Sequence, residues 1–178
     1  MKRWTVVLLV CAGCGSSSPT DSPDVSEPGS QGSFVFVRVV DVEVYVMRVQ
    51  KTFGTVAVMI DEYTAISQQW LGGVTTRYRT QQYTQNLLTR VKLLREQVVE
   101  IRPEDAELLS VHIKYEEALK DYQEAFEMFL ADTNFPFPVI TQEVNNKLAE
   151  GNVHLIRFQV ILSNMSGRSI AFLREGVG

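Results

Sequence analysis

No proline falls between Phe34 and Arg102, and the first half of this stretch carries one apolar residue at every third or fourth position. The repeat runs through Val35, Val39, Val42, Val46, Val49, Phe53, Val56, Ile60, Tyr63, Ser67 and Trp70. Because an α-helix turns once in 3.6 residues, these side chains share one face. Such a face is typical of a long helix in a bundle or coiled coil.

The stretch from Val35 to Val46 also carries a strand signal, because valine stands at nearly every second position. However, no turn residue interrupts residues 34–53, and a strand of that length would be unusual. We therefore predict a helix, with a strand as the alternative.

Three breaks divide the rest of the chain, namely Gly72–Gly73, Pro103 and the segment 134–138. Glycine pairs and prolines end or reverse helices, and we expect Pro103 to open the third one. The blocks between the breaks repeat apolar residues with helical spacing. In the second block, Val74–Arg102, these are Tyr83, Leu87, Val91, Leu94, Val98 and Ile101. In the third they are Leu108, Val111, Tyr115, Ala118, Tyr122, Phe126 and Phe129, and in the fourth Val144, Leu148, Leu155, Phe158, Leu162, Met165 and Phe172.

Four amphipathic blocks joined by short breaks predict an all-α domain over residues 34–178, an antiparallel up-down-up-down four-helix bundle. The charges favour pairing of its second and third helices. Residues 74–102 hold six bases and two acids, whereas residues 104–132 hold two bases and nine acids. We expect the acidic surface to face its partner helix and solvent rather than to bind cations.

The first fourteen residues have the pattern of an export signal. Lys2 and Arg3 precede an apolar run over residues 4–10, and Cys11–Cys14 follows with two small residues between the cysteines. A positive start, a short apolar stretch and small residues predict a signal peptide over residues 1–13. A buried N-terminal strand or helix is the alternative.

This leader resembles that of bacterial lipoprotein precursors, in which an aliphatic residue, two small residues and a cysteine end the apolar stretch. Ala12, Gly13 and Cys14 match the last three positions, whereas Cys11 stands where the family usually has leucine. The resemblance implies diacylglyceryl lipidation of Cys14 with a further N-acyl chain such as palmitate, which gives stable anchoring. Because Gly15 rather than aspartate follows, it implies the outer membrane, facing the periplasm. Ordinary cleavage near Ala12 or Gly13 is the alternative.

Residues 15–33 contain seven serines, three prolines and three glycines, with Val25 as the single aliphatic residue. Such a segment buries too little surface to offset its ordering entropy. We therefore expect residues 14–33 to be a disordered tether, with a reach of about 25 Å, between the lipid on Cys14 and the bundle.

Two features exceed what an isolated bundle requires. Five residues of the first block fall opposite or beside its apolar face: Val37, Val40, Val44, Met47 and Val58. They predict a surface for a protein partner or a second copy, unless that part of the helix is covered by the loop near Phe135. In that loop Phe135 and Phe137 alternate with prolines, and their rings either cap the end of the bundle or form a recognition tip.

The sequence lacks the motifs of catalysis and cofactor binding. It contains no Gly-x-Ser-x-Gly, no Cys-x-x-Cys-His and no glycine-rich phosphate loop. His112 and His154 lie beside the apolar faces, so we expect partly exposed or hydrogen-bonded residues rather than metal ligands. We predict no enzymatic activity, no metal and no cofactor. A formal charge of −4 argues against a nucleic-acid partner.

These observations predict a non-enzymatic, lipid-anchored protein of the cell envelope whose bundle binds another protein or self-associates. The alternative is a ligand-sensing bundle in the periplasm, with a small molecule held between its helices. Tyr45, Tyr83, Tyr115 and Tyr122 are the candidate lining residues of such a pocket.

Overall fold

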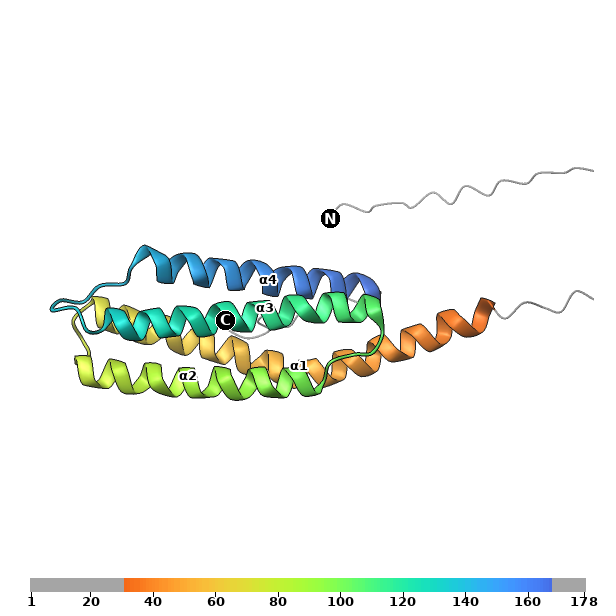
Figure 1. Cartoon of the computed structure of the whole chain (residues 1–178), viewed down its shortest axis with the longest axis horizontal. Coiled ribbons are helices and arrows are strands. Elements are labelled where there is room, and N and C mark those ends of the chain that lie inside the picture. The colour runs from red at the N-terminus through yellow and green to blue at the C-terminus, as the bar shows by residue number, and fades with distance from the viewer. Residues whose placement is uncertain (1–30, 168–178) are drawn as a thin grey trace, which may run out of the picture.

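The structure, a computed structural model, describes the backbone of residues 31–167 and the side chains of residues 41–167. This part of the chain forms four α-helices, α1 (Gln31–Leu71), α2 (Arg77–Glu100), α3 (Ala106–Asp132) and α4 (Gln142–Ser166). They run alternately up and down as one bundle (Figure 1). The predicted all-α four-helix fold is confirmed. The strand alternative is wrong, because residues 35–46 are helical.

Helix α1 is much longer than the others. Its 41 residues span about 60 Å at 1.5 Å per residue, against about 40 Å for the 27 residues of α3. Its N-terminal part therefore projects beyond the other helices (Figure 1). Residues 31–33 belong to α1 and not to the predicted tether, because extending a formed helix is far easier than starting one. The rest of the tether, with Cys14, lies outside the described residues.

The helix ends differ from the predicted ones where a capping residue decides them. Thr76 caps α2, and its side-chain oxygen accepts from Arg79 N at 3.3 Å, so the helix begins three residues after Val74. Asp105 caps α3 by accepting from Leu108 N at 2.8 Å. Pro103 consequently lies in the preceding turn and does not open the helix.

Helix α4 ends earlier than its apolar repeat suggested. Gly167 adopts a left-handed conformation, with φ of 64°, and ends the helix after Ser166. Phe172, which we predicted on the apolar face of this helix, lies outside the described residues.

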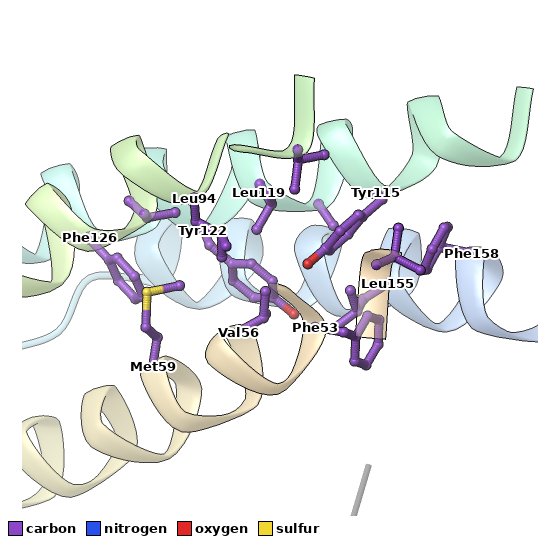
Figure 2. Packing of buried hydrophobic residues seen from close by; sticks show 14 of the residues in the cluster. Phe53, Val56, Met59, Leu94, Tyr115, Leu119, Tyr122, Phe126, Leu155 and Phe158 are labelled. Carbon is purple, nitrogen blue, oxygen red and sulfur yellow. The ribbon is translucent and has the colours of Figure 1, made fainter. Parts of the chain in front are cut away.

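Among the described side chains, the core contains the predicted face of α1 from Val42 onward, together with residues of the other three helices. Phe53 of α1, Tyr115 of α3 and Phe158 of α4 are fully buried and pack ring against ring (Figure 2). The Tyr115 and Phe158 ring centroids lie 4.9 Å apart, and the centroids of Phe53 and Phe158 lie 6.0 Å apart. These stacked rings join three helices at the middle of the bundle.

Helices α3 and α4 are the most closely packed pair. Gly151 of α4 is buried against the ring of Tyr122, and a Cβ atom at position 151 would lie 3.1 Å from Tyr122 Cε1. The Tyr122 hydroxyl donates to Oδ1 of the next residue, Asn152, at 2.8 Å. The apolar pattern did not predict that Gly151 is buried, because this position requires a small residue rather than an apolar one.

The buried face of α2 differs from the prediction in its first turns. Thr80 and Thr84 are fully buried there, whereas Tyr83 is 49% exposed. The Thr80 hydroxyl donates to the Thr76 carbonyl at 3.0 Å, and the Thr84 hydroxyl donates to the Thr80 carbonyl at 2.8 Å. Because these hydroxyls are satisfied within the helix, threonine can face the core, and Tyr83 is turned toward solvent.

Candidate functional site

Two connecting segments meet at the end of the bundle opposite the start of α1: the turn between α1 and α2, and the loop between α3 and α4 (Figure 1). Four exposed apolar residues lie at this end, and we name them the tip: Leu71, the last residue of α1, and Val74, Phe135 and Phe137 of the connecting segments. These residues are between 44% and 80% exposed. The two phenylalanines were predicted from the sequence, whereas Leu71 and Val74, which flank the Gly72–Gly73 break, were not.

Hydrogen bonds hold the backbone of the tip loop in place. Arg77 Nη2 donates to the Phe135 carbonyl at 2.6 Å, and Trp70 Nε1 donates to the Val139 carbonyl at 3.2 Å. Thr141 N donates to Asp132 Oδ2 at 2.7 Å. Trp70 is buried at this end of the core, whereas the rings of Phe135 and Phe137 are 44% and 61% exposed.

The exposed charges around the tip are weakly basic, and an acid at this end, Asp132, is buried. No aspartate or glutamate occurs between Glu62 and Glu96, whereas Arg77 and Arg79 lie at the start of α2. The loop of residues 133–141 carries no charge. Glu143, in the first turn of α4, is an exposed acid at this end.

A groove of about 770 Å³ lies between α1 and α2 next to the tip. Its lining includes the buried Ile66 and Leu87, the half-exposed Tyr83, and Tyr78 and Arg79. The remaining lining residues are Glu62, Ala65, Gln69, Gln82, Asn86 and Arg90. The groove thus combines a small apolar floor with aromatic rings, amides and arginine.

No protein-family model matches this sequence, and no curated protein or solved structure shows significant similarity to it. Within residues 31–167, no helix is long and apolar enough to cross a membrane.

The described residues that were predicted on the outer face of α1 are exposed. Val44, Met47 and Val58 are between 38% and 65% exposed, and the loop near Phe135 does not cover them. Val44 and Met47 lie one turn apart on α1, and the exposed Lys51 lies between them and Val58 along the helix. The side chains of Val37 and Val40 lie outside the described residues.

The four tyrosines predicted to line a pocket do not share one: Tyr45 lines a small hollow near Pro103, and Tyr83 lines the groove between α1 and α2. Tyr45, Tyr115 and Tyr122 are buried among other side chains, and burial raises the pKa of each of their hydroxyls. Only Tyr83 of the four candidates lines the groove between α1 and α2.

The predicted hydrogen bonding of the two histidines is confirmed, but partial exposure is wrong for His112. It is fully buried, and its Nδ1 lies 2.7 Å from the Tyr45 hydroxyl. Its Nε2 lies 3.2 Å from Glu116 Oε1. Burial lowers the pKa of His112, although the Glu116 carboxylate opposes this effect. His154 Nδ1 lies 2.9 Å from Asp121 Oδ2. The described residues contain no cluster suited to a metal ion.

The acidic face of α3 pairs with α2, as the charges predicted, and also with α4. Arg102 Nη2, in the turn after α2, lies 3.0 Å from Glu116 Oε2, and Lys92 Nζ of α2 lies 3.7 Å from Glu127 Oε1. On the other side, Lys147 Nζ lies within 3.4 Å of oxygens of Asp121, Glu124 and Glu150. Hydrogen bonds to the Glu150 and Glu124 carboxylates raise the pKa of Lys147.

Proposed function

We propose that this protein is a non-enzymatic docking protein of the cell envelope, anchored by lipid on Cys14, whose tip binds another protein. The exposure of Phe135 and Phe137 on a loop with a fixed backbone is the observation that carries this proposal.

A fixed apolar loop is suited to binding. Aromatic residues contribute much of the binding free energy at protein interfaces, and exposed apolar clusters mark such sites. Because Arg77 and Trp70 already hold the loop backbone, binding would cost little further backbone entropy. The tip therefore offers four apolar contacts from two segments that need no rearrangement.

The charges favour a different protein over a second copy. A two-fold symmetric contact between two tips would bring Arg77 and Arg79 of both copies close together, and like charges repel. We infer that the partner presents an apolar pocket with acidic residues around it.

The position of the tip agrees with anchoring at the N-terminus. Helix α1 begins at the opposite end of the bundle and is about 60 Å long (Figure 1). A lipid on Cys14 would thus place the tip on the side away from its membrane. The lipobox-like residues 11–14 support this anchor, and Gly15 supports the outer membrane, with the bundle facing the periplasm.

Site-specific photo-crosslinking in the organism that makes the protein tests the docking proposal. A photoreactive phenylalanine at position 137 is expected to give one discrete adduct with another protein, whereas the same group at the exposed position 47 gives none. An adduct of twice the chain's own mass would indicate self-association, and an adduct with lipid would indicate a membrane as the partner. Either result, or no adduct at position 137, would overturn the proposal.

Mass spectrometry of the mature N-terminus tests the anchor separately. We expect an acylated Cys14 as the first residue and a loss of membrane attachment in Cys14→Ser. A retained Cys11 or an unmodified Cys14 would refute lipidation.

A further inference from the structure

The groove between α1 and α2 lies beside the first turns of α2. Thr80 and Thr84 fill the interior positions of its first turns, and threonine is small. Tyr83, which would otherwise fill that space, stands at the groove instead. The groove has a volume of about 770 Å³, within the range typical of small-molecule sites.

The charges in the groove do not cancel. Arg90 pairs with Glu62 across the two helices, so this arginine and the single acid of the lining neutralise each other. Arg79 has no acidic partner among the described residues, and its Cζ lies 5.6 Å from the centre of the Tyr83 ring. One positive charge is therefore left over in a groove with an aromatic wall.

The uncharged polar groups lie near the same wall. Gln82 Nε2 donates to the Tyr78 hydroxyl at 2.7 Å, which fixes the amide beside this exposed ring. Gln69 and Asn86 add further amides to the lining. These groups can donate and accept hydrogen bonds but add no charge.

We propose that this groove binds a small organic monoanion with an aromatic body. Its carboxylate or sulfonate accepts hydrogen bonds from the Arg79 guanidinium, which suits a planar or forked anion. Its ring lies against Tyr83 and Tyr78 over the apolar floor of Ile66 and Leu87. This site does not depend on what the tip binds.

Fluorine NMR on the full chain carrying Cys14→Ser tests the site with two probes of the same shape. We expect the fluorine signal of 4-fluorobenzoate to broaden in the presence of the protein, and the broadening to show saturable binding with a Kd on the order of 1 mM for so small a ligand. The neutral 4-fluorobenzamide should bind at least fivefold more weakly, because it lacks the charge that pairs with Arg79.

Two arginine variants give a matched comparison. Arg79→Gln should weaken binding of 4-fluorobenzoate at least fivefold, while Arg157→Gln, on the exposed surface of α4 and outside the groove lining, should leave the Kd within twofold. Both arginines are exposed, and a melting curve of each variant checks that the fold is retained. Equal binding of the two probes, equal effects of the two variants, or no saturable broadening would overturn the proposal.

Discussion

Two glycines within helices provide a sharp test of how tightly α3 and α4 pack. Gly151 of α4 faces α3, and a Cβ atom there would lie 3.1 and 3.2 Å from two Tyr122 ring carbons and 3.3 Å from the Ala118 carbonyl oxygen. Gly54 of α1 is exposed, and a Cβ atom there would meet nothing within 4 Å. The same substitution by alanine thus probes packing at one site and helix propensity at both.

The expected magnitudes follow from these contacts. Alanine is better than glycine in a helix by about 1 kcal/mol, so Gly54→Ala should raise the free energy of unfolding by about that amount. At position 151 the same gain is opposed by overpacking, which costs about 1–3 kcal/mol. Tyr122 cannot move aside freely, because its hydroxyl is bonded to Asn152. We therefore expect Gly151→Ala to be less stable than Gly54→Ala by about 1–3 kcal/mol.

Urea unfolding followed by circular dichroism at 222 nm measures both values, provided that the slope with urea is unchanged. Adding Tyr122→Phe to Gly151→Ala should recover part of the loss, because the ring then has no hydroxyl to hold it. If Gly151→Ala stabilised the protein as much as Gly54→Ala, the close approach of α3 and α4 would be refuted.

Two further predictions concern buried polar groups. Because burial lowers the pKa of His112 below its ordinary value of 6.5, the unfolded chain binds more protons than the folded one just below pH 6.5. The free energy of unfolding should therefore have its full value above pH 6.5 and decrease as the pH falls from 6.5 toward the lowered pKa. Urea unfolding measured between pH 7 and 5 should show a smaller decrease for His112→Gln. Asp121→Asn should destabilise the protein by about 1–3 kcal/mol, since it removes a nearly buried carboxylate that binds His154 and Lys147. A double-mutant cycle with His154→Gln should show a coupling energy between the two residues. If the two changes in stability simply added, a direct interaction would be excluded.

The burial of His112 depends on tertiary contacts that the local sequence does not reveal. The spacing of His112 placed it beside the apolar face, yet it is fully buried. Its partner Tyr45 lies on another helix, 67 residues earlier in the chain, and their hydrogen bond makes burial of the imidazole acceptable. Helical spacing carries no information about such a partner, so this burial could not be predicted.

The candidate site was predictable only in part for a related reason. Phe135 and Phe137 stand out in the sequence, but whether they cap the core depends on Trp70, which is buried at this end of it. Leu71 and Val74 join them only because the two connecting segments meet at one end of an antiparallel bundle (Figure 1).

The sequence by itself determined the number, type and buried faces of most helices, because apolar periodicity and helix-breaking residues act over a few turns of chain. The tertiary structure decided how those faces were filled, with Thr84 instead of Tyr83 in the core and Gly151 at the closest approach of two helices. It also decided which apolar side chains were left in water. Such choices depend on the size and hydrogen bonding of side chains from different helices, which meet only once the bundle has formed.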